Sequence, residues 1–109
     1  MPSILVVLTS SPGTPAGQQA LALAESLTDQ GHVLTLCCLQ DAAVLGSHCP
    51  PRDAHAVFGR LLARGARCAV LGEDLRLRGL QESPHASVLD QADLVTLLAA
   101  DHDRVIGAL

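Results

Sequence analysis

Short runs of apolar residues recur along the chain, separated by segments with helical spacing. The first run, residues 4–8, has no polar interruption, a pattern typical of a strand buried on both faces of a sheet. Further strands are expected at residues 33–39, 66–71, 87–89 and 104–108. The pattern therefore predicts about five strands.

Helix signals lie between these runs. Thr14 followed by Pro15 is typical of an N-cap and a first helical residue, and Gly31 stands where this helix would end. Asp53 is expected to cap a second helix and Asp90 a third, each followed by an apolar stripe. Shorter helical turns are expected at residues 41–45 and 73–77.

The alternation of strands and helices decides the fold class. Connections of this kind are right-handed crossovers between parallel strands. We therefore expect a three-layer α/β/α fold around a mainly parallel sheet. The chain has 109 residues and no internal repeat or linker, so residues 1–109 are expected to form a single domain.

Composition narrows the class of function. Apolar residues make up 49% of the chain, but Phe58 is the one aromatic residue, and the formal net charge is −4. A chain without basic runs or aromatic platforms is not expected to bind nucleic acid directly. Neither a signal peptide nor a membrane-spanning run is evident, so a cytoplasmic protein is expected.

The sequence contains four cysteines, Cys37, Cys38, Cys49 and Cys68. Cys37 and Cys38 are adjacent on a predicted strand and would point to opposite faces, where they suit core packing better than chelation. Cys49 precedes two prolines in a predicted loop, and Cys68 lies within the third strand. Cys49 and Cys68 are the candidate reactive thiols. No spacing typical of metal ligands occurs, so neither a metal nor another cofactor is expected.

The turn after the first strand is a candidate anion site. In a parallel sheet it lies at the carboxyl edge, where ligands commonly bind. Free N–H groups at the start of the next helix could hold an anion, although the turn matches neither a dinucleotide-binding nor a P-loop motif. A plain connecting turn is the alternative. The residues concerned are Ser10, Ser11, Gly13 and Thr14.

The segment after the third strand resembles a known family. Residues 71–80 read Leu-Gly-Glu-Asp-Leu-Arg-Leu-Arg-Gly-Leu and are similar to a motif of the TusB/DsrH family, small subunits of sulfur-relay complexes. Leu-Gln-Asp at residues 39–41 and the element order along nearly the whole chain also resemble that family. The resemblance implies a DsrE-like fold. It also implies that four residues belong to the family motif or contact partner subunits: Glu73, Asp74, Arg78 and Gly79.

The same resemblance implies partner subunits, and it also shows where this sequence departs from the catalytic members of the family. Related chains assemble with DsrE/TusD-like and DsrF/TusC-like subunits, and persulfide sulfur passes between cysteines by thiolate attack. Aligning the Arg-Gly of the catalytic subunits on Arg78 and Gly79 places their acceptor cysteine at Leu71, which cannot carry sulfur. Cys68 lies three residues earlier.

Three functions therefore remain open. The first is an accessory, non-catalytic subunit of a sulfur-relay complex serving tRNA 2-thiouridine synthesis or sulfur oxidation, as a hetero-oligomer or a homo-oligomer. The second is a sulfurtransferase that uses its own Cys49 or Cys68. The third is a stand-alone domain that binds a small molecule or nucleotide at the first turn.

Overall fold

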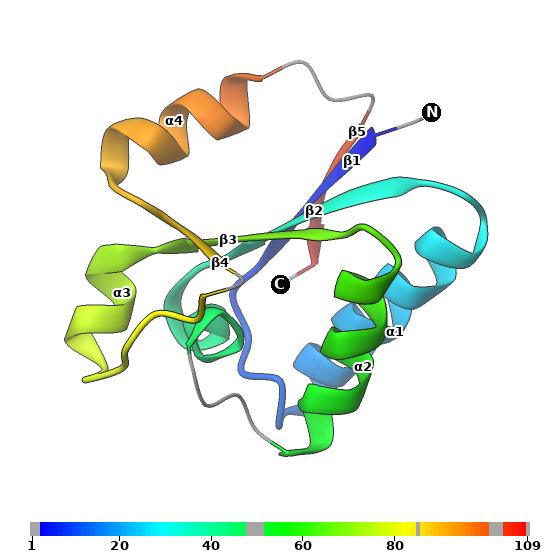
Figure 1. Cartoon of the computed structure of the whole chain (residues 1–109), viewed down its shortest axis with the longest axis horizontal. Coiled ribbons are helices and arrows are strands. Elements are labelled where there is room, and N and C mark those ends of the chain that lie inside the picture. Colours follow the sequence, from blue (N-terminus) through cyan, green and yellow to red (C-terminus); the bar gives the residue numbers. More distant parts are fainter. Residues whose placement is uncertain (1–2, 48–51, 85, 101–103, 109) are drawn as a thin grey trace.

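Five parallel strands form one sheet in the computed structural model, which describes residues 3–47, 52–84, 86–100 and 104–108. The strand order across the sheet is β4-β3-β2-β1-β5 (Figure 1). All four pairings are parallel, which confirms the expected sheet. The strands are β1 (Ser3–Leu8), β2 (Val33–Cys38), β3 (Arg67–Leu71), β4 (Ala86–Leu89) and β5 (Arg104–Ala108).

The helices lie on both faces of this sheet, as expected for three layers. The chain steps from β1 through β4 in one direction and then returns across the sheet to β5. Right-handed crossovers therefore place α1 (Pro15–Asp29) and α2 (Arg52–Ala63) on one face and α4 (Gln91–Ala99) on the other (Figure 1). The 3₁₀ helix η1 (Gln40–Gly46) and the short helix α3 (Gly72–Leu77) follow β2 and β3.

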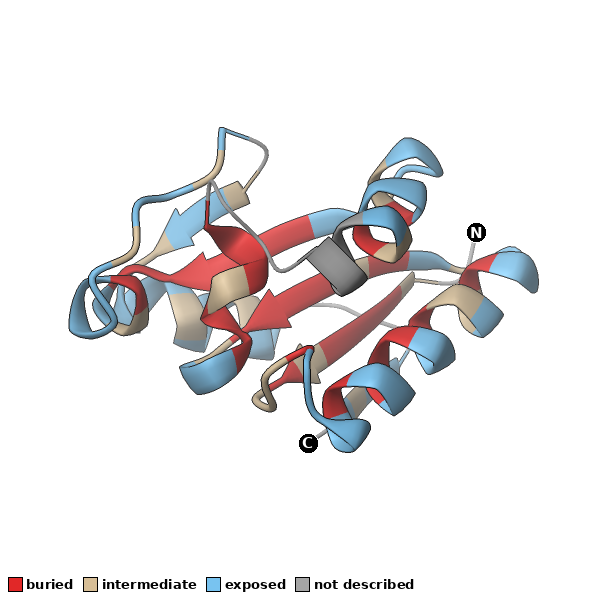
Figure 2. Ribbon diagram, turned by 90° about the horizontal axis from the view of Figure 1, so that it is seen from below, coloured by how far each residue is buried: buried red, intermediate tan, exposed pale blue. Residues whose placement is uncertain are grey.

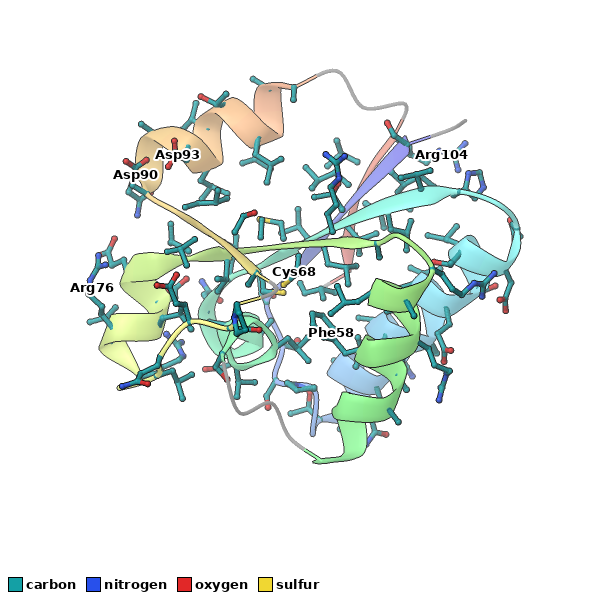
Figure 3. The ribbon with its side chains drawn as sticks, viewed as in Figure 1. Phe58, Cys68, Arg76, Asp90, Asp93 and Arg104 are labelled. Carbon is teal, nitrogen blue, oxygen red and sulfur yellow. The ribbon has the colours of Figure 1, made fainter. Side chains whose placement is uncertain are left out.

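The local signals for helix ends are largely confirmed. The Thr14 hydroxyl accepts the N–H of Gly17 at 3.1 Å, and Gly31 has the positive φ of 91° that favours glycine after a helix. At α4, Asp90 and Asp93 form a complete capping box (Figure 3).

One helix start differs from the expectation. The second helix, α2, begins at Arg52, so Asp53 is inside the helix and is not its N-cap. An acidic residue is favoured in the first helical turn as well as at the cap, so the sequence signal does not separate the two positions.

The main core lies between the sheet and the pair α1 and α2. Buried residues are concentrated in the strands and along the inner side of α1 (Figure 2). Phe58 of α2 lies between the helices and the sheet and is 6% exposed (Figure 3). In contrast, α4 has no buried residue, although it carries Leu94, Val95, Leu97 and Leu98. The helices α1 and α2 are therefore packed closely on one face of the sheet, whereas α4 is packed more lightly on the other.

Candidate functional site

The carboxyl ends of β1 to β4 meet at one edge of the sheet because the strands are parallel. At this edge β3 passes into α3 without a loop: Leu71 is the N-cap residue and Gly72 the first helical residue. A Cβ atom on Gly72 would lie 2.9 Å from Cγ1 of Val88, so glycine allows α3 to pack closely on β4. This close packing directs the Glu-Asp-Leu motif toward the segment that follows β2.

Asp74 joins the ends of β2 and β3. Its Oδ2 atom accepts the backbone N–H of Gln40 at 2.8 Å, across 34 positions of sequence. Gln40 has a φ of 51°, in the left-handed region that non-glycine residues rarely adopt. A charge-assisted hydrogen bond of this kind is among the stronger contacts in a protein, and it holds the strained residue in place.

Arg78 adds a second link between the same segments. One of its terminal nitrogens lies 3.1 Å from Oδ1 of Asp41, and the other lies 3.6 Å from Oδ1 of Asp74. Gly79 follows with a φ of 65° and turns the chain away. We call the four residues Gln40, Asp41, Asp74 and Arg78 the edge latch.

Glu73 faces a different element from Asp74, although the two residues are adjacent. Its Oε2 atom accepts a hydrogen bond from the Gln91 side chain at 2.9 Å, which links α3 to the start of α4. Of the motif residues, Asp74 and Arg78 therefore belong to the edge latch, whereas Glu73 connects α3 to α4.

Two thiols meet inside the core instead of at the edge. The sulfur atoms of Cys38 and Cys68 lie 3.9 Å apart, and both residues are buried. The hydrogen bond they share and burial raise the pKa of Cys38 well above its usual value, while the same bond lowers the pKa of Cys68. Cys68 is only 4% exposed, so its thiol is enclosed in the core and does not reach the carboxyl end of β3.

The remaining positions to consider are Cys37, Cys49 and Leu71, the last of which aligns with the acceptor cysteine of the catalytic subunits. Cys37 lies on the sheet face opposite Cys38, is also buried, and has a pKa raised by burial to about 11. Leu71 occupies the end of β3 and is 7% exposed. Cys49 lies outside the described residues.

The first turn uses several of its polar groups in contacts within the chain. The Thr14 hydroxyl donates to the Ser11 carbonyl at 2.7 Å, and the Thr14 backbone N–H donates to the same oxygen at 3.0 Å. Pro15 has no N–H, and the N–H of Gly17 is taken by Thr14. Ser10 and Gly13 lie in the same turn, part of whose donor capacity is thus used within the chain.

Sequence reasoning found the two motif segments but missed their contacts. The sequence indicates residues 39–41 and 71–80 as two separate motif segments, and the structure brings them together in the edge latch. The contact between Cys38 and Cys68 was also missed, because it depends on the register that sets Leu36 beside Cys68. Strand adjacency and register were the signals needed to find both.

Metal-ligating clusters and membrane-spanning helices are both absent from the described part of the chain. No group of three or more His, Cys, Asp or Glu side chains in it is placed to hold a metal ion. Nor does any helix within these residues combine the length and apolar composition needed to cross a bilayer.

Comparison with solved structures identifies the architecture. The chain is similar to the YchN protein from E. coli, with a TM-score of 0.78 and 20% sequence identity over 98% of this chain and 99% of that one. The likeness and the sheet order confirm the expected DsrE-like fold. No family model matches the sequence, and no curated protein is similar to it.

Proposed function

We propose that this chain is an accessory, non-catalytic subunit of a cytoplasmic sulfur-relay complex. In this role it binds DsrE/TusD-like and DsrF/TusC-like subunits, or further copies of itself, and helps to place their reactive cysteine. The relay would serve tRNA 2-thiouridine synthesis or sulfur oxidation. The fold shared with YchN and the motif of residues 71–80 support this proposal.

The main support for this proposal is the position of the cysteine thiols in the fold. Transfer of persulfide sulfur requires a thiolate that a second cysteine can reach. The end of β3 presents Leu71, and the three described thiols are all buried. Raised pKa values keep Cys37 and Cys38 protonated near neutral pH. Within the described residues, this arrangement suits assembly better than it suits carrying sulfur.

The edge latch supports the same role. It stiffens the carboxyl edge by joining the segments after β2 and β3 through Asp74 and Arg78. A surface fixed in advance binds a partner with a smaller loss of conformational entropy. We therefore place the partner contact at this edge.

Co-purification tests the assembly. The chain is co-expressed with one DsrE-like and one DsrF-like subunit, and a stable complex is expected by size-exclusion chromatography. Arg78→Ala removes the arginine contacts of the latch with Asp41 and Asp74 and is expected to weaken the complex. Arg64→Ala serves as the matched control, because Arg64 pairs with Asp29 between α1 and α2, away from the edge. Failure of the unmodified chain to join the partners or itself would overturn the proposal.

Mass spectrometry separates this function from sulfur transfer by the chain itself. After incubation with a persulfide donor, the native chain is expected to gain no mass. An addition of about 32 Da, one sulfur atom, on Cys49 or Cys68 would instead identify a sulfurtransferase. Comparison with Cys49→Ser and Cys68→Ser would then assign the thiol.

A further inference from the structure

A small pocket lies between α3, the segment that follows it and β4, at the free edge of the sheet. Its volume is about 160 Å³, and its lining residues are Gly72, Leu75, Arg76, Leu80, Glu82 and Val88. Leu75 is buried, Leu80 is half-buried and Val88 is exposed, and these three side chains form the apolar part of the lining.

Two opposite charges accompany this apolar lining. Arg76 and Glu82 line the same pocket, and both side chains belong to exposed residues. The ion pairs found among the described residues do not include either of them. The pocket thus offers one cationic and one anionic group that remain available to a ligand.

Backbone contacts hold both charged residues in place. Arg76 belongs to α3, and its side chain extends on the outer side of that helix (Figure 3). Its Nη1 atom would lie 3.3 Å from a Cβ atom on Gly72, so the guanidinium rests against the glycine. Glu82 is fixed by an antiparallel bridge to Ser47, and the next N–H, of Ser83, donates to Gly46 at 2.9 Å.

We propose that this pocket binds a small aliphatic α-amino acid in its zwitterionic form. The carboxylate of the ligand pairs with Arg76, its ammonium group pairs with Glu82, and its side chain packs on Leu75, Leu80 and Val88. Guanidinium and carboxylate groups form charge-assisted hydrogen bonds with these ligand charges. The site is separate from the proposed relay function, because the pocket contains no thiol and the edge latch contributes no lining residue.

Nuclear magnetic resonance can test this on the isolated ¹⁵N-labelled chain. Titration with L-valine is expected to give saturable shifts of the Gly72, Leu75 and Val88 amides, with a dissociation constant of roughly millimolar size for so small a ligand. Isovalerate lacks the ammonium group and isobutylamine lacks the carboxylate. Each is expected to bind at least about fivefold more weakly, since one charged contact is lost.

Matched variants assign the two contacts. Arg76→Gln should weaken L-valine binding at least about fivefold while leaving isobutylamine unaffected. Glu82→Gln should weaken L-valine binding similarly while leaving isovalerate unaffected. Arg67→Gln, an exposed arginine of β3 outside the pocket, is the control and should bind L-valine normally. The amide spectrum of each variant verifies its fold.

Two results would overturn the inference. One is an absence of saturable shifts with L-valine in a chain whose spectrum shows it to be folded. The other is equal binding of L-valine, isovalerate and isobutylamine, which would reduce the site to an apolar hollow. Either result leaves the co-purification and mass measurements of the proposed function unaffected.

Discussion

Single residues decide how closely the elements of this fold approach one another. Gly17 lies in the first turn of α1 and is buried against the turn that follows β1. A Cβ atom there would overlap the backbone of Ser11 and lie 2.8 Å from Cα of Pro12. Both neighbours are backbone, which cannot rotate away as a side chain would. Glycine at this position therefore permits contact between α1 and the carboxyl edge of the sheet.

Gly17→Ala is expected to destabilise the protein by about 1–3 kcal/mol, because the added methyl group forces backbone atoms apart. The control is Gly59→Ala in α2, where a Cβ atom meets nothing within 4 Å. That change should stabilise the helix by roughly 0.5–1 kcal/mol. Urea unfolding followed by far-ultraviolet circular dichroism measures both. Equal effects of the two variants would contradict the close contact at Gly17.

The described thiols are expected to resist modification in the folded chain. With a pKa of about 11, only about one Cys37 thiol in a thousand is ionised at pH 8. We expect the Cys49→Ser variant to react with a thiol-specific reagent at none of its cysteines when native. The same variant should react at Cys37, Cys38 and Cys68 in urea. Rapid native labelling of any of them would contradict the enclosed positions on which the accessory role depends.

At the scale of elements, the edge latch joins two segments that each follow a strand. The 3₁₀ helix η1 begins at Gln40, whose left-handed conformation is costly for a side chain with a Cβ atom. The carboxylate of Asp74, 14% exposed, accepts the N–H of that residue. The contact stabilises the conformation of η1 as well as the position of α3.

Asp74→Ala is expected to lower the free energy of unfolding by about 1–2 kcal/mol, because a backbone N–H loses a charged acceptor. The neighbouring change Glu73→Ala is the matched control. Glu73 is exposed, so its loss should cost no more than about 0.5 kcal/mol. Chemical denaturation of the two variants gives the comparison. A Glu73→Ala effect as large as that of Asp74→Ala would place the main link at α4 instead of η1.

The elements were more predictable from sequence than their contacts. Unbroken apolar runs such as residues 4–8 predict buried strands, and the Thr14 and Asp90 caps predict helix starts, because these signals are local. The link between Asp74 and Gln40 is not local. It depends on β2 and β3 being neighbours in the sheet and on a backbone angle that the glutamine itself disfavours. The meeting of Cys38 and Cys68 depends likewise on strand register.

At the scale of the whole molecule, packing is uneven between the two faces of the sheet. The core with α1 and α2 encloses the central strands, and Leu34, Leu36 and Val70 are almost fully buried. On the opposite face α4 is capped by Asp90 but contributes no buried residue. A helix gains most of its stability in a protein from packing and not from its own hydrogen bonds. The isolated chain should therefore open first at α4.

Amide hydrogen exchange is expected to reveal this order. Amides of β1 and β2 should exchange only by global unfolding, because both strands are paired on each side. Amides of α4 should exchange at least about a hundredfold faster, since local opening exposes little apolar surface. The control within the same experiment is α1, which buries five residues including Leu21 and should exchange slowly. Equal protection of α4 and α1 would contradict weak packing and would indicate that another chain covers α4. Repeating the measurement across a range of protein concentrations separates these cases, because protection by a second copy increases with concentration whereas intrinsic packing does not.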